Sequence, residues 1–146
     1  MIMTKTKKYF SFFLLPLSLI GLIDSFAIHQ KIYGGYYLPC VIGKSCDIVL
    51  YSKYSTLFGV HLSYWGIAFY SFIFLLALLN IFFGKKFLRF IYYSSIFAGM
   101  IFSLYLLYLQ IFLIGNLCVY CVVSFSDILL ASVLSSLVIF NKNKSF

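Results

Sequence analysis

The stretch IFLIGNLCVYCVVSF, residues 111–125, joins two long apolar runs through Gly115 and Asn116. The runs cover residues 90–114 and 117–140. Each is long enough to cross a bilayer as a helix, which takes about 20 mostly apolar residues. A link this short forces the two helices to be antiparallel neighbours. The stretch therefore predicts a helical hairpin with Cys118 and Cys121 beside its tip.

The rest of the chain is also strongly apolar. Of its 146 residues, 64% are hydrophobic and only 10% are charged, whereas soluble domains are about 45–50% apolar and about 25% charged. Two more runs, 9–28 and 62–83, are long and apolar enough to span. We therefore predict an all-α membrane protein, a bundle of four transmembrane helices that forms a single domain over residues 1–146.

The first run has an alternative interpretation. Its lysine-rich start and the small residues around Phe26 resemble a secretory signal peptide with a cleavage site. The run is long and aromatic for a signal peptide, so we favour a spanning helix.

The basic residues decide between a membrane protein and a nucleic-acid-binding protein. The formal net charge is +8, but most of the basic residues flank the apolar runs. With four crossings these residues share one side, as in the positive-inside pattern: Lys5, Lys7, Lys8, Lys85, Lys86, Arg89, Lys142 and Lys144. We expect both termini in the cytoplasm, the four cysteines on the outer side, and no nucleic-acid partner.

The segment 29–61 is then an outer loop. In its second half, apolar residues recur at helical spacing while polar residues fall between them: Val49, Leu50, Tyr54, Leu57 and Phe58. This pattern predicts a short amphipathic helix that caps the outer end of the bundle with its apolar side inward. An interfacial helix without a functional role is the alternative.

The four cysteines form two pairs, Cys40 with Cys46 in the outer loop and Cys118 with Cys121 at the helix end. A disulfide stabilises the folded state more when it closes a longer loop. A disulfide between the two cysteines of CxxC would therefore contribute little to stability. A four-thiolate zinc site needs regular ligand spacing, which these pairs lack. A structural or metal-handling protein with passive cysteines remains the alternative to redox chemistry.

Thiol–disulfide exchange explains the pairs better. Asn116 is a candidate N-cap, which would place Cys118 in the first turn of a helix, where the helix dipole favours a thiolate. A mobile dithiol and a fixed one form a relay, since each exchange needs a thiolate and an accessible disulfide. The relay needs a lipid-soluble electron acceptor at its end, and a membrane quinone is the obvious one.

These residues resemble the vitamin K epoxide reductase family, including its bacterial homologues. The matching positions follow one order along the chain: Cys40, Cys46, Ser52, Phe58-Gly59 and the CVYC of residues 118–121. The DsbB type of quinone-linked membrane protein has its cysteines in the reverse order. The resemblance covers most of the chain and implies a four-helix bundle around a quinone, capped by the loop helix.

The resemblance also implies roles for the cysteines. Cys40 would meet an external thiol partner, Cys46 would exchange with Cys118, and Cys121 would pass electrons to the quinone, menaquinone or ubiquinone. Ser52 would support the cap and the site by hydrogen bonding. In bacterial members the reaction reoxidises an exported thioredoxin-like protein at the cytoplasmic (inner) membrane. Some members carry this partner as a fused domain, and here we expect a separate protein and no metal.

A comparison with animal members of the family indicates which residues would contact the quinone. Animal members place an asparagine and a tyrosine where this chain has Leu62 and Phe125, so epoxide reduction is the less favoured activity. His61 and Ser63 are candidate donors to the quinone carbonyls, with a surface histidine of no role as the alternative. The candidate ring contacts are Leu50, Phe58, Trp65 and Phe125.

Two acids lie in the apolar runs. Asp127 follows Cys118 by nine residues, about 13–14 Å along a helix, so it lies near the middle of the membrane. Polar residues at this depth are functional candidates. Asp127 is either a proton relay for quinol formation or part of a hydrogen bond between helices. We expect Asp24 to be interfacial.

Overall fold

The computed structural model describes residues 2–41 and 43–144, with side chains described from 12 to 41 and from 43 to 140. Its four long helices are α1 (Ile2–Gly34), α3 (Leu62–Phe83), α4 (Lys86–Tyr108) and α5 (Val119–Lys144). The π-helical segment η2 (Leu109–Ile114) continues α4. All four helices are long and apolar enough to cross a membrane. The predicted four-helix membrane bundle is confirmed.

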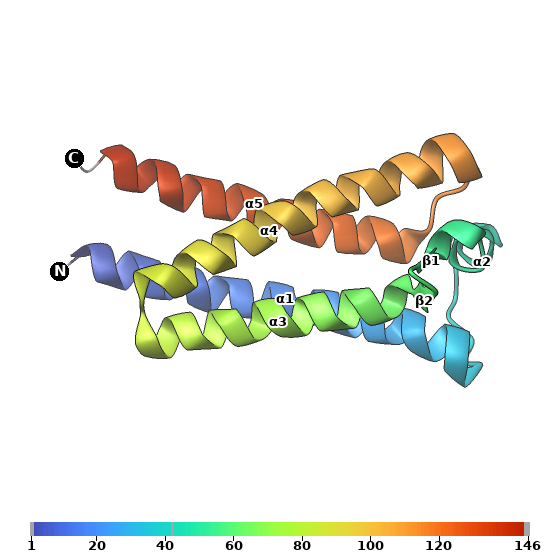
Figure 1. Cartoon of the computed structure of the whole chain (residues 1–146), viewed down its shortest axis with the longest axis horizontal. Coiled ribbons are helices and arrows are strands. Elements are labelled where there is room, and N and C mark those ends of the chain that lie inside the picture. The colour runs from blue at the N-terminus through green and yellow to red at the C-terminus, as the bar shows by residue number, and fades with distance from the viewer. Residues whose placement is uncertain (1, 42, 145–146) are drawn as a thin grey trace.

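The two ends of the bundle differ. Both termini and the turn between α3 and α4 lie at one end, and the connections 35–61 and 115–118 lie at the other (Figure 1). We call the second end the cysteine end. The segments that carry the flanking basic residues are together at the opposite end, although the side chains before residue 12 and after residue 140 fall outside the described part.

The predicted helix bounds hold for α3 and need correction for the other three helices. Helix α4 begins at Lys86 instead of Phe90, and α5 covers Val119–Lys144 instead of 117–140. Helix α1 begins at Ile2 instead of Tyr9. Helix α1 continues to Gly34 instead of ending at Ile28, so the outer loop is shorter than expected. Aromatic packing accounts for the extension. The His29 ring lies 4.9 Å from that of Tyr33 and 4.5 Å from that of Tyr64, between ring centroids. These contacts join the last turns of α1 to the first turn of α3.

The cap is only partly the expected amphipathic helix. It consists of α2 (Ser45–Leu50), a 3₁₀ turn η1 (Lys53–Ser55) and a hairpin of β1 (Thr56–Leu57) and β2 (Val60–His61). Val49 and Leu50 point inward and are buried, as predicted.

Phe58 does not point inward, because the chain turns at this residue. Phe58 and Gly59 have φ values of 55° and 78° and form the two-residue hairpin loop between β1 and β2. Positive φ at both residues is the geometry that two-residue hairpins favour. The Phe58 side chain is 89% exposed, so the expected packing of Phe58 beneath a helical cap is wrong.

Two buried clusters hold the bundle together. The larger joins all four long helices and consists of Leu14, Leu17, Ile73, Leu76, Ala77, Tyr92, Ile96, Ile128 and Ala131. The smaller cluster lies at the cysteine end and consists of Ile28, Cys46, Val49, Leu50 and Cys118. Gly66 allows α3 to approach α1 closely, since a Cβ atom there would lie 2.6 Å from Ser25 Oγ.

Candidate active site

The four cysteines meet at the cysteine end. Cys40 and Cys46 form a disulfide, and Cys118 and Cys121 are free thiols. Cys46 and Cys118 are fully buried in the same cluster, and the other two cysteines pack against it. The two pairs differ in their redox state. The fold packs Cys46, the second cysteine of the loop pair, in the same buried cluster as Cys118, the first cysteine of CxxC.

Gln110 positions Cys118. Helix α5 begins at Val119, so Cys118 directly precedes the helix instead of lying in its first turn. The backbone N–H of Cys118 donates to Oε1 of Gln110 at 3.1 Å. The expected N-cap, Asn116, instead donates from its side chain to the carbonyl of Ile114 at 3.3 Å. The role of Gln110 was not predicted from the sequence, where the one indication is a polar residue within an apolar run.

The surroundings of Cys118 favour its thiolate. The hydrogen bond from the Cys121 thiol is the largest cause, and it lowers the pKa of Cys118 from 9.0 to about 7 against the opposing effect of burial. The backbone N–H groups of Cys121 and Tyr120 and the nearby Lys31 cation add to the lowering. A thiolate is the attacking species in disulfide exchange, so Cys118 is suited to attack near neutral pH.

Three tethers hold the outer segment over the bundle. Nζ of Lys31 in α1 forms an ion pair with Asp47 at 2.6 Å and donates to the Leu38 carbonyl at 3.4 Å. The Tyr120 hydroxyl in α5 donates to the Pro39 carbonyl at 2.8 Å. His61 supplies the third tether, from the start of α3 to the end of α2. The Cys40–Cys46 disulfide is thus held above Cys118.

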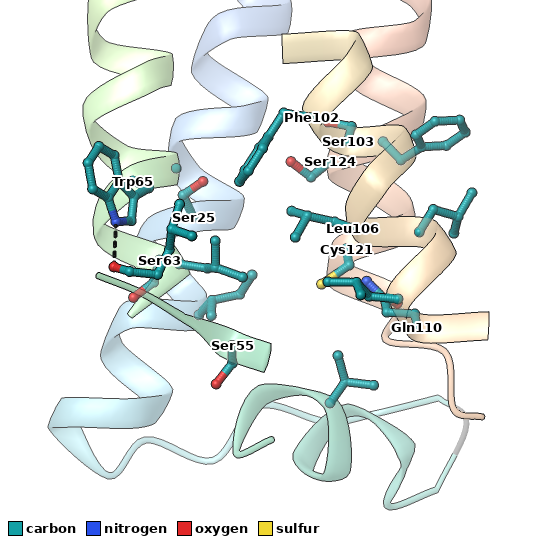
Figure 2. A pocket seen from close by; sticks show the side chains of 18 of the residues that line it. Ser25, Ser55, Ser63, Trp65, Phe102, Ser103, Leu106, Gln110, Cys121 and Ser124 are labelled. Atoms are coloured by element: carbon teal, nitrogen blue, oxygen red, sulfur yellow. Dashed lines mark hydrogen bonds between the residues drawn. The ribbon is translucent and has the colours of Figure 1, made fainter. Parts of the chain in front are cut away.

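A cavity of about 390 Å³ lies beneath the cap. All four long helices, η2 and the outer segment contribute to its wall. Figure 2 shows Cys121, Ser124 and Gln110 on one side of the cavity, and Trp65, Ser63 and Ser25 on the opposite side. The lining includes, besides Cys121, the expected contacts Leu50, Ser52, His61, Ser63, Trp65 and Phe125. Phe58 is not part of the lining, so the ring contact expected of Phe58 is not found.

The model of the vitamin K epoxide reductase family matches residues 12–136 of the chain. This chain belongs to the vitamin K epoxide reductase family. The resemblance drawn from the order of the cysteines is therefore confirmed. No curated protein sequence matches the chain closely enough to count as a relative. Members of the family are thiol–disulfide oxidoreductases, and the chain is a membrane oxidoreductase of this kind.

His61 and Ser63 line the cavity and also form hydrogen bonds within the protein. Nε2 of His61 lies 3.0 Å from the Leu50 carbonyl, and Nδ1 accepts the backbone N–H of Ser63 at 3.2 Å. The Ser63 hydroxyl also lies 3.1 Å from Nδ1. Both ring nitrogens are engaged within the protein, so the histidine caps α3 and holds α2. It is buried, which corrects the interpretation as a surface histidine.

Several other polar residues of the cavity wall are also hydrogen-bonded within the protein. The Ser52 hydroxyl donates to the Val49 carbonyl at 2.8 Å, and Ser55 donates to the Ser52 carbonyl at 2.7 Å. In α3, Tyr70 bonds to the Ser124 hydroxyl at 2.8 Å. These hydrogen bonds fix the shape of the cavity.

The two acids of the spanning helices are both buried, with Asp24 8% and Asp127 7% exposed. Asp24 lines the cavity, so its side chain faces the interior of the bundle. Its Oδ2 is buried and makes no hydrogen bond to any described residue. Asp127 is not among the residues that line the cavity. The sequence could not distinguish the two, because the rotation of each helix decides what its side chains face.

Proposed function

We propose that this protein is a quinone-coupled thiol–disulfide oxidoreductase that reoxidises a separate, exported thioredoxin-like protein. One observation carries the proposal: the two thiols of CxxC face different surroundings. Cys118 packs in one buried cluster with Cys46, and Cys121 lines the cavity. A dithiol placed between a disulfide and a cavity suits the transfer of electrons from one to the other.

The relay has three balanced steps. A thiolate of the partner attacks the disulfide at Cys40, releases the Cys46 thiolate, and leaves as the partner's own disulfide. The Cys46 thiolate then attacks the Cys118–Cys121 disulfide at Cys118, and Cys40 closes the loop disulfide again, which leaves Cys118 and Cys121 as thiols. Finally this pair closes to a disulfide and loses two protons, and the acceptor takes up its two electrons together with two protons.

The cavity suits a quinone as the acceptor. Its volume of about 390 Å³ lies within the range of about 300–1,000 Å³ usual for ligand sites. Leu50, Trp65, Phe102 and Phe125 in its wall would hold an apolar ring. When bound, menaquinone or ubiquinone would supply an acceptor of two electrons.

The wall of the cavity also supports access from the bilayer. Trp65 in α3 and Phe102 in α4 line the cavity, yet they remain 43% and 38% exposed. Ala98 in α4 is likewise an exposed part of the lining. A lipid-soluble ligand could therefore pass between these helices without crossing water.

Thiol oxidation is favoured over epoxide reduction. Leu62 and Phe125 both line the cavity, and both are apolar at positions where animal members have an asparagine and a tyrosine. The wall thus lacks the two polar groups that these residues would supply.

The orientation in the membrane and the docking of the partner form part of the proposal. The basic segments gather at the end opposite the cysteines, and positive charge favours the cytoplasm. This supports an outward-facing cysteine end in a bacterial cytoplasmic membrane. There the partner would reach Cys40, which lies beside the 87% exposed Val41.

Quinone reduction by the purified protein with a dithiol donor is the direct test. Wild-type protein should reduce quinone with the donor present and should not do so without it. The variant Cys121→Ala should lose the activity, because the dithiol can no longer close. Wild-type rates with Cys121→Ala would contradict the proposed last step.

A thiol trap tests the partner step separately. In Cys46→Ala the Cys40 thiol has no intramolecular partner, so it should form a stable mixed disulfide with a thioredoxin-like protein. The double variant Cys40→Ala, Cys46→Ala is the matched control and should form none at the loop. A protein with passive cysteines would give no specific adduct with either variant.

A further inference from the structure

Asp24 is the acid that shares a cavity with a reacting thiol. The chain contains only three acidic residues, Asp24, Asp47 and Asp127. Asp47 is half-exposed and paired with Lys31, and Asp127 lies outside the cavity lining. Asp24 is buried in α1 and lines the cavity together with Cys121. Its position singles it out for chemistry in this cavity.

The Asp24 carboxyl also has an unengaged oxygen in the wall of the cavity. Its Oδ2 is buried and has no hydrogen-bond partner among the described residues. By contrast, His61 uses both ring nitrogens, and the Tyr70 hydroxyl bonds to Ser124. An unpaired buried polar group is costly, and a group that enters the cavity could supply the missing hydrogen bond to Asp24.

Asp24 lies within electrostatic reach of the reacting thiols. Its charge interacts with Cys118, Cys121, Asp127 and Tyr70. These groups come from α3, α5 and the link before α5, so the carboxyl lies where several helices converge. A change in the charge of the dithiol therefore changes the electrostatic potential at the Asp24 carboxyl.

We propose that the carboxyl group of Asp24 transfers a proton between the Cys118–Cys121 dithiol and the electron acceptor in the cavity. The inference rests on the proposed function and adds the group that moves the proton. From the sequence, Asp127 was either a proton relay or part of a hydrogen bond between helices. The structure favours Asp24, because it is the acid that lines the cavity.

The step balances within the dithiol and the acceptor. As the Cys118–Cys121 bond forms, two S–H bonds are lost and two electrons leave with two protons. Asp24 takes the proton of the Cys121 thiol and gives it to an acceptor oxygen, so the carboxyl ends as it began. The proton of Cys118 passes to the outer solution, and the acceptor takes its second proton from the same side.

Infrared difference spectroscopy gives a readout that does not depend on turnover. Spectra of the full chain are taken with Cys118 and Cys121 as thiols and as a disulfide, without added quinone. A carboxyl band of Asp24 should change between the two forms, because the thiol of Cys121 in the same cavity loses its proton. Since the chain has only three acidic side chains, single Asp→Asn variants assign the band.

The band should disappear from the difference spectrum of Asp24→Asn and remain in that of Asp127→Asn. A difference spectrum without any Asp24 band would overturn the inference. So would a band that disappears only in Asp127→Asn, which would assign the role to Asp127. If Asp24→Asn does not fold, a shift of the band in Asp24→Glu identifies the same group.

Kinetics then tests the transfer itself. Pre-reduced Asp24→Asn should oxidise its dithiol with quinone about 100-fold or more slowly than wild type, the usual scale of acid–base catalysis. Asp24→Glu should recover part of the rate.

The outcomes separate the two proposals. If wild-type protein does not reduce quinone, the proposed function fails, and the infrared result still shows whether Asp24 responds to the thiols. If wild type reduces quinone and Asp24→Asn does so at the same rate, only the proton-transfer role is overturned.

Discussion

The side-chain oxygen of Gln110 accepts the backbone N–H of Cys118 at 3.1 Å. Gln110 lies in the π-helical segment η2 that continues α4. The backbone carbonyl of Gln110 also accepts the N–H of Asn116 at 3.2 Å. π-helical turns are rare and often occur at functional sites. Here the turn brings a buried glutamine over the tip of the hairpin. One side chain thus fixes the first cysteine of CxxC to the neighbouring helix.

Replacing Gln110 with leucine should destabilise the protein. Leucine is close in size but leaves the buried N–H of Cys118 without an acceptor, which costs about 1–3 kcal/mol. The free energy of unfolding in detergent is the measurement. Asn116→Ala is the matched control, because Asn116 is partly exposed and its side chain bonds only to the adjacent Ile114 carbonyl. Equal losses for the two variants would contradict the positioning role of Gln110.

The dithiol should titrate close to neutral pH. With the pKa of Cys118 lowered to about 7, its thiol is protonated and unreactive below that pH and becomes a thiolate as the pH rises through it. The ultraviolet absorbance of the thiolate, followed with the Cys40–Cys46 disulfide intact, measures the midpoint.

In Cys121→Ala this midpoint should move upward, because the variant removes the largest cause of the lowering. The thiolate would then form only at higher pH. A midpoint that stays near pH 7 in Cys121→Ala would show that another group stabilises the thiolate.

Lys31 and Asp47 should affect Cys118 differently, although they form one ion pair at 2.6 Å. The Lys31 cation helps to lower the pKa of Cys118, so Lys31→Gln should raise the thiolate midpoint. Asp47→Asn keeps the cation and should not raise it. The same absorbance titration compares the two variants. Equal upward shifts would mean that the ion pair acts by holding the cap and not through charge.

His61 should contribute to stability through two hydrogen bonds. His61→Ala removes the cap on the Ser63 N–H and the bond to the Leu50 carbonyl, each worth about 1 kcal/mol. His61→Asn retains a good N-cap residue but not the reach to Leu50, so it should lose about half as much. The thermal midpoint should fall in the order wild type, Asn, Ala. If the thermal midpoint fell as far in His61→Asn as in His61→Ala, the hydrogen bond from His61 to the Leu50 carbonyl would account for most of the contribution.

The sequence by itself determined the membrane class, the number of spans and the pairing of the cysteines in the chain. These features are local. A run such as 62–83 must be a spanning helix because its side chains suit lipid along its whole length. The order of Cys40, Cys46, Cys118 and Cys121 likewise needed no coordinates, and it led to the correct family.

Only the tertiary structure decided which side chains face the cavity. Asp24 and Asp127 both lie in apolar helices, and the rotation of α1 and α5 places one in the cavity wall and the other outside it. Phe58 continued a helical pattern, but a hairpin turn at positive φ points it outward. Gln110 meets Cys118 because α4 ends as a π-helix. The position of each of these side chains depends on packing between segments far apart in the chain. Hydropathy averaged along the chain carries no information about such packing.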